Sequence, residues 1–202
     1  MRKYLFLGTV VGVLGQYEVR ANWDLTSVQT NDDKCAFSDV QVDESKLSMT
    51  LKDFSAGALD SLSAIDDSLV ECKTRVSFLL PAGQRLGTFT HRVIAYAAKD
   101  ELAELRMNVS INHNLSDFTF RGTLPFGTRF NDRVLLYKSF DVRKLVECSD
   151  IEQLLVFNIS WTLEVIKRAG AKIGYISMAE DGALADTWLK TEACSLSNAL
   201  TR

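Results

Sequence analysis

The segment spanning residues 67–83 most constrains the fold, because it has the pattern of a long strand with a defined end. Every second residue across 72–80 is apolar or small, whereas Lys73 and Arg75 stand between them. An alternation of period two places the two sets on opposite faces of a strand. Pro81 lacks the N–H group that a strand ladder uses, so the strand should end at the Pro-Ala-Gly turn.

The same period recurs along the chain. Its longest run, residues 153–167, places six apolar side chains on one face: Leu155, Phe157, Ile159, Trp161, Leu163 and Val165. Shorter alternations, each predicting a strand, occupy residues 40–51 (with a hairpin turn at 43–46), 89–98, 105–111, 118–120, 134–140 and 173–178. Short alternating strands without a sustained helical period predict an all-β, antiparallel β-sandwich, formed by one domain over residues 16–202.

The remaining segments are expected to connect these strands. Residues 16–34 should form an extended leading segment, and residues 55–67 and 122–131 should be loops. Residues 97–105 have a helical composition, but we expect a turn that leads into the next strand. Residues 181–191 are expected to form a short helix or a loop.

Residues 1–15 have the layout of a secretory signal peptide. Arg2 and Lys3 precede an apolar stretch, residues 4–14, that is too short to span a bilayer. Cleavage is expected before Gln16, with a site near Ala21 as the alternative, and a buried N-terminal strand is the competing interpretation. No later apolar run approaches the roughly 18 residues of a spanning helix, and residues 195–202 lack the apolar tail of a lipid-anchor signal. We therefore expect a secreted protein with no membrane segment in its mature form.

The cysteines agree with an oxidising compartment. There are four: Cys35, Cys72, Cys148 and Cys194. Their even number and wide spacing predict two disulfides, with free thiols as the alternative. The residues alone leave all three pairings open. No C-x-x-C pair is present, which disfavours a zinc knuckle or a redox motif.

Three N-glycosylation sequons predict a glycoprotein of the eukaryotic secretory route. They begin at Asn108, Asn114 and Asn158. Asn158 falls on the polar face of the 153–167 strand, where a glycan would extend into solvent. If the source is bacterial, the three sequons have no such meaning.

The charge balance and the positions of the histidines limit the functions that the chain could have. With 23 basic and 26 acidic residues, the chain lacks the basic footprint of a nucleic-acid-binding protein. His91 and His113 stand outside any nucleophile motif. We expect His91 to be a strand residue with an ordinary partner, and His113 to be exposed in a turn.

The carboxylate pairs and the tryptophans are weaker candidates for a metal-binding or sugar-binding site. Three carboxylate pairs stand at 32–33, 43–44 and 66–67, and we expect them to lie in solvated turns. Calcium binding by the first or the third pair is the alternative, although the spacing of these residues matches no known calcium-binding loop. Trp23, Trp161 and Trp188 could stack on a sugar, but Trp161 belongs to an apolar face and only Trp188 is expected to be exposed. We therefore assign no catalytic residue, metal ligand or cofactor.

The order of these motifs resembles the secreted family catalogued as domain of unknown function 4360. The matching features are Cys35 followed by Val40 and Val42, Asp67-Ser68 with Cys72 and the turn from Pro81 to Gly83, Arg92 with Tyr96, and Cys148, the strand through Trp161, and Cys194. The family's Arg-Gly-Tyr triplet is replaced here by residues 92–96. The resemblance implies secretion, a β-sandwich and the pairs Cys35–Cys72 and Cys148–Cys194, and it provides no catalytic residue.

Two functions compete at this point. The first is non-catalytic recognition of a glycan or an extracellular protein, and the alternative is a secreted hydrolase acting on a polysaccharide or an ester. Recognition requires an open surface, whereas hydrolysis requires convergent acids in a pocket. Because the sequence contains no recognisable catalytic motif, we favour recognition.

Overall fold

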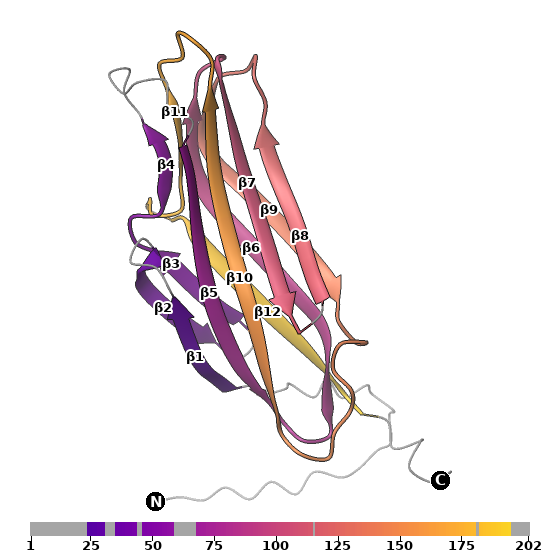
Figure 1. The fold of residues 1–202 in the computed structure, drawn as a ribbon. Helices are drawn as coiled ribbons and strands as arrows, with labels where there is room; N and C mark the ends of the chain where they lie inside the picture. The colour runs from indigo at the N-terminus through magenta and orange to yellow at the C-terminus, as the bar shows by residue number, and fades with distance from the viewer. Residues whose placement is uncertain are drawn as a thin grey trace, which may run out of the picture.

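The computed structural model describes residues 24–30, 35–43, 46–58, 68–114, 116–180 and 182–194. Within them the chain forms two antiparallel sheets that face each other, as predicted (Figure 1). The expected signal peptide lies outside the described residues. No helix in the described ranges is long and apolar enough to cross a membrane.

Sheet A has five strands in the order β1-β5-β10-β7-β8. Their bounds are β1 Asp24–Thr30, β5 Ser68–Leu80, β7 Ala103–His113, β8 Ser116–Leu124 and β10 Gln153–Lys167. β5 ends before Pro81 and β10 spans 153–167, so both predicted strands are confirmed. The face of β10 that was predicted to be apolar is buried throughout, and Trp161 is fully buried.

Sheet B has seven strands: β2 Phe37–Asp43, β3 Lys46–Leu51, β4 Ser55–Ala58, β6 Gln84–Lys99, β9 Phe130–Asp141, β11 Gly174–Ser177 and β12 Leu184–Ala193. One edge of β6 pairs with β12 and then with β11, and the other edge pairs with β9 along its length. β3 and β4 extend the sheet beyond β12 and β11, and β2 forms a hairpin with β3. β9 is therefore an edge strand.

Two local expectations differ from the structure, and a third is confirmed. Residues 181–191 were predicted to be a helix or a loop, but most of them belong to β12, an interior strand. Its Asp186 and Thr187 are fully buried, and these polar residues interrupt the apolar pattern. Part of the expected 55–67 loop is strand β4. The chain turns between β6 and β7, so the strand interpretation of residues 97–105 is confirmed.

The core lies between the sheets, and His91 is part of it. His91 is fully buried, and its Nε2 accepts a hydrogen bond from Trp161 Nε1 at 3.0 Å. Because an indole N–H can only donate, the imidazole proton resides on Nδ1, which lies 2.9 Å from Thr187 Oγ1. Burial lowers the pKa of His91 to about 3, and the nearby charge of Asp186 opposes this shift.

Candidate ligand-binding face

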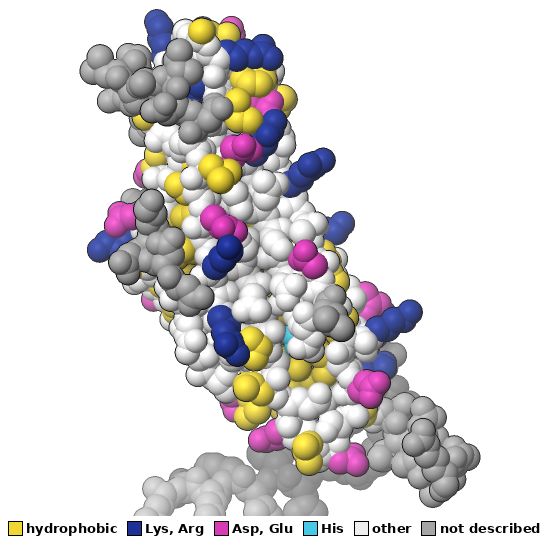
Figure 2. All heavy atoms as spheres, viewed as in Figure 1, with side chains coloured by type: hydrophobic (Ala, Val, Ile, Leu, Met, Phe, Trp, Pro, Cys, Tyr) yellow, Lys and Arg dark blue, Asp and Glu magenta, His cyan; other side chains and the backbone are white. Residues whose placement is uncertain are grey.

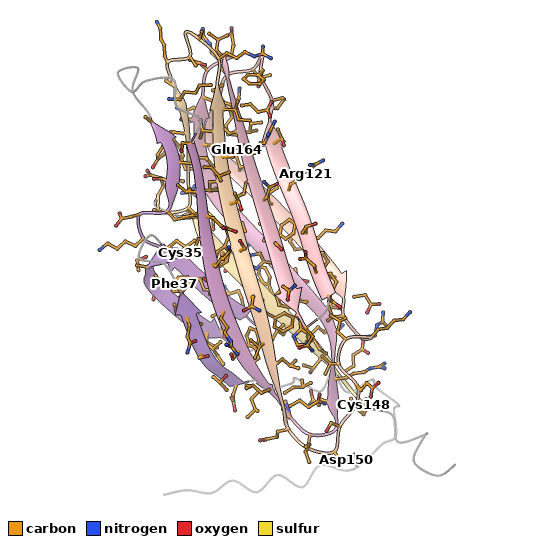
Figure 3. The ribbon with its side chains drawn as sticks, viewed as in Figure 1. Cys35, Phe37, Arg121, Cys148, Asp150 and Glu164 are labelled. Atoms are coloured by element: carbon orange, nitrogen blue, oxygen red, sulfur yellow. A yellow bond between two sulfur atoms is a disulfide. The ribbon has the colours of Figure 1, made fainter. Side chains whose placement is uncertain are left out.

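The four cysteines form two disulfides, in the pairing that the family resemblance implied. Cys35 pairs with Cys72 at a Cα separation of 5.3 Å, and Cys148 pairs with Cys194 at 5.8 Å. Cys35 lies beside the middle of the sandwich and Cys148 at one end of it (Figure 3). Each bridge connects segments next to different sheets, so both hold the two layers together.

The three sequons lie on sheet A or at its end. Asn108 on β7 and Asn158 on β10 both alternate with buried residues, so their side chains face outward from sheet A. Asn158 is exposed and Asn108 is half-buried. Asn114 is exposed in the turn after β7, with a φ of 52°. Whether these sequons carry glycans stays a prediction.

The outer face of sheet A is mainly polar. In Figure 2 most of this face is backbone or uncharged polar side chains, with scattered charged side chains and few apolar ones between the two ends of the sandwich. Its cross-strand rows join polar side chains, as in Arg75–Asn158–Asn112–Asp117. Arg121 on β8 and Glu164 on β10 belong to this surface (Figure 3).

The other sequence candidates are distributed over the molecule. His113 was expected to be exposed, but it is buried because it continues the inward face of β7. Its ring stacks on Phe157 at 4.7 Å, and its Nδ1 lies 2.8 Å from the carbonyl oxygen of Val156. Trp188 is half-buried on the outer face of sheet B, and Trp23 lies outside the described residues.

The carboxylate pairs gather at no described site. Asp43 is exposed at the end of β2, whereas Glu44 and the pairs at 32–33 and 66–67 lie outside the described residues. Among the residues that are described, no group of three or more His, Cys, Asp or Glu side chains could hold a metal ion.

The outer face of sheet B combines aromatic and fixed polar side chains. On β6, β9 and β12, the inward residues fill the core and the outward residues meet in cross-strand rows. One row runs Tyr137–Arg92–Asp186, and the next runs Leu135–Ile94–Leu184. Tyr137 and Leu135 are each 60% exposed, and they occupy successive outward positions of β9, so they form one contiguous exposed pair.

Arg92 is held in place at the centre of this face. Its Nε donates to Asp186 Oδ2 at 3.0 Å, and its Nη2 donates to the same oxygen. Asp186 is fully buried, and its Oδ1 accepts from Ser48 Oγ at 2.7 Å. The guanidinium also lies over the Trp188 ring, 5.0 Å from its centroid. Three contacts thus fix an arginine that remains about one-third exposed, at 34%.

A pocket of about 400 Å³ opens at one end of the same face. It is lined by Tyr96, Ala98, Lys99, Arg129, Phe130, Asn131 and Ile173. The Tyr96 hydroxyl donates to Asn131 Oδ1, which orients the amide and leaves its Nδ2 group as a donor for another partner. Lys99 is buried, and its Nζ donates to the carbonyl oxygens of Asp100 and Thr128. Desolvation lowers the pKa of Lys99.

The sequence pattern indicates only part of this face. The alternation within the predicted strand at 89–98 places Arg92, Ile94 and Tyr96 on one side, and Trp188, which was expected to be exposed, is half-buried on this face. Tyr137, Leu135 and Asn131 were missed. A signal for the first two exists, because they are large apolar residues on the side of β9 opposite Val134 and Leu136.

No family model matches the chain, and no curated protein matches it, so the resemblance to domain of unknown function 4360 stays a prediction. Several solved structures align with the chain at low TM-scores. One is a family 61 carbohydrate-binding module in complex with β-1,4-galactotriose, which is 11% identical with a TM-score of 0.32 over 84% of this chain and 88% of that one.

Two further modules are similar to a comparable extent. A family 4 carbohydrate-binding module is 14% identical with a TM-score of 0.28, over 88% of this chain and 92% of that one. A family 27 module described as recognising mannan is 11% identical with a TM-score of 0.28, over 83% of this chain and 88% of that one. At these TM-scores the similarities carry no argument about this protein.

Proposed function

We propose that this protein is a secreted, non-catalytic glycan-binding protein, and that the outer face of sheet B is its binding surface. The observation that carries the proposal is the row in which the exposed Tyr137 stands beside Arg92, itself fixed by Asp186 and Trp188. A pyranose ring has apolar C–H faces and a rim of hydroxyl groups. It therefore matches a surface that offers an aromatic ring next to rigid hydrogen-bonding groups.

The rigidity of Arg92 favours binding. A free arginine loses rotamer entropy when it is immobilised, by about 0.5–1.5 kcal/mol for such side chains. Here the Asp186 carboxylate and the Trp188 ring have already fixed the guanidinium. The donors that Asp186 does not use can bind ligand oxygens without that loss.

The pocket supports binding rather than hydrolysis. Its lining offers aromatic rings, an amide and cationic side chains, whereas glycoside hydrolysis uses two carboxyl groups that face each other. A small number of polar groups set among apolar ones is typical of a ligand site. An extracellular protein partner remains the competing occupant of this face.

The two disulfides suit the secretory route that the sequence predicts, because such bonds persist in oxidising compartments. Glycans at Asn108 and Asn158 would extend from sheet A. The proposed binding surface on sheet B would then remain open.

The test measures binding and turnover together. The oxidised protein should be applied to a glycan array and to immobilised cellulose, chitin, xylan, mannan and galactan, and assayed in parallel on glycosidase and esterase substrates. Tyr137→Ala should weaken binding about tenfold, which corresponds to about 1.4 kcal/mol of lost ring contact. Leu69→Ala is the matched control, because Leu69 is a large side chain, 65% exposed, on the outer face of sheet A.

Saturable binding that Tyr137→Ala weakens and Leu69→Ala leaves unchanged would support the proposal. Failure to bind any glycan would overturn it. Turnover that a single Asp, Glu or His substitution abolishes would establish the hydrolase alternative instead.

A further inference from the structure

We infer that the ligand is a linear, neutral oligosaccharide that lies along β9, from Tyr137 at one end to the pocket around Asn131 at the other. This inference rests on the proposed function and specifies its ligand class. Four outward positions of β9 form the track: Asn131, Arg133, Leu135 and Tyr137. All four are exposed, and they follow one another at every second residue.

The length of the track sets the length of the ligand. From Asn131 to Tyr137 the strand advances about 20 Å, at roughly 3.3 Å per residue. A pyranose unit in an extended chain is roughly as long as one and a half strand residues, so the track accommodates about four units. Because β9 pairs with β6 without a register shift, these four side chains form one continuous row, which suits an unbranched chain.

The two ends of the track differ in chemistry. At the Tyr137 end, an exposed ring and the fixed Arg92 guanidinium stand side by side on neighbouring strands. At the pocket end, the Asn131 amide is oriented by the Tyr96 hydroxyl, and it presents N–H donors between apolar walls that include Phe130 and Ile173. The Tyr137 end should therefore supply affinity through stacking. The pocket should select a sugar with a correctly placed acceptor oxygen.

The charges along the track favour a neutral ligand over a uronic acid. Arg92 is paired with the buried Asp186, and Arg129 at the pocket is paired with Glu101 at 3.2 Å. Arg133 also has an interaction partner, and its guanidinium lies so close to Gly182 that a Cβ there would stand 2.6 Å from Nη2. A ligand carboxylate would have to compete with these partners for each guanidinium group, most strongly at Arg92, whose partner is buried.

The test is an oligosaccharide ladder measured by isothermal titration calorimetry. The probes are the cello-, xylo-, manno- and β-1,4-galacto-oligosaccharides from disaccharide to hexasaccharide, with tetragalacturonate as the charged comparison. Affinity for the preferred series should rise with each unit up to about four units and then level off, since the track ends there. Tetragalacturonate should bind more weakly than the preferred tetrasaccharide.

Variants at the two ends distinguish binding along the whole track from binding at a single point. Asn131→Ala and Tyr137→Ala should each weaken tetrasaccharide binding about tenfold. Tyr96→Phe removes only the hydroxyl that orients Asn131, and it should weaken binding in the same direction while preserving the ring. Lys138→Ala is the control, because Lys138 is exposed on the opposite side of β9, and it should have no effect.

The outcomes distinguish this inference from the proposed function. If the disaccharide and the hexasaccharide bind equally well, or if Asn131→Ala has no effect where Tyr137→Ala does, the track is wrong and glycan binding stands. Preference for tetragalacturonate would overturn only the inference that the ligand is uncharged. If none of the polysaccharides and none of the probes binds, both proposals fail.

Discussion

At the scale of single residues, His91 should make the stability of the fold depend on pH. Its pKa falls from 6.5, the ordinary value expected in the unfolded chain, to about 3 in the buried site. The unfolded chain therefore binds a proton below about pH 6.5 that the folded chain rejects, so stability is full above that pH and falls as pH decreases toward 3.

The consequence can be measured by urea unfolding. Between about pH 7 and about pH 4.5, His91 should account for a loss of about 3 kcal/mol in the free energy of unfolding. His91→Gln keeps an acceptor for Trp161 and a donor for Thr187 but cannot titrate in this range, so it should lose less stability across the same interval. Identical pH dependence of the two proteins would show that His91 is not the group responsible.

Thr74 provides a second prediction at this scale. Its Oγ1 is buried and has no hydrogen-bond partner among the described residues, whereas Thr187 Oγ1 is bonded to His91. A buried hydroxyl without a partner costs about 1–3 kcal/mol, so Thr74→Val should raise the free energy of unfolding by about 1 kcal/mol. Thr187→Val is the matched substitution at a bonded hydroxyl and should lower it. Equal effects of both substitutions in denaturant titrations would contradict this interpretation.

Trp161 fills the centre of the core. It is fully buried, and its indole N–H is bonded to His91. Trp161→Ala should therefore cost about 3–5 kcal/mol of unfolding free energy, from the lost burial and the cavity left behind. A loss below about 1 kcal/mol in urea would mean that this side chain does not pack as described.

At the scale of elements, the strands that were predicted correctly are those whose pattern is local. β5, β7 and β10 alternate apolar and polar residues because one face meets the core and the other meets solvent. β12 escaped prediction because it lies inside sheet B and its outward Asp186 is buried too. That burial depends on Arg92 and Ser48, which are 94 and 138 residues away in the chain.

In the candidate site too, positions within one strand were predictable from the sequence, whereas contacts between distant strands were not. Arg92 and Tyr96 could be assigned to one side of a strand from the sequence, but their neighbours Tyr137 and Asn131 come from the register between β6 and β9. Residues that stand opposite each other on β6 and β9 are far apart in the sequence, so their pairing leaves no local sequence pattern. The pairing of aromatic and polar groups was therefore not predictable from the chain alone.

The link between β6 and β12 can be tested directly. Asp186→Ala leaves Arg92 without its carboxylate partner and opens space in the interior of sheet B. The free energy of unfolding should fall by about 1–3 kcal/mol, because Ser48 loses its buried acceptor and the guanidinium of Arg92, which is 34% exposed, is compensated only in part by solvent. The double variant Arg92→Met/Asp186→Leu removes both charges and should recover part of that loss. If the double variant is no more stable than Asp186→Ala, the cost does not come from the unpaired arginine.

At the scale of the whole molecule, the two disulfides stabilise the scaffold and lie apart from the proposed binding face. Cys35 precedes β2 of sheet B and pairs with Cys72 on β5 of sheet A. Cys148 precedes β10 of sheet A and pairs with Cys194, which follows β12 of sheet B. Each bond thus joins the two layers, and none of the four cysteines lines the pocket or lies on β9.

This separation predicts that stability and binding respond differently when a bridge is removed. The disulfides span 37 and 46 residues, and in the chain-entropy model loops of that size each contribute roughly 4 kcal/mol. The double variant Cys148→Ser/Cys194→Ser should lose about that much unfolding free energy in urea. Its affinity for the glycan that the unmodified protein binds should stay within about threefold under conditions where it remains folded, since a threefold change is below 1 kcal/mol. A folded variant that binds tenfold more weakly would show that the bridge also shapes the binding face, and that the scaffold and the recognition surface form one unit.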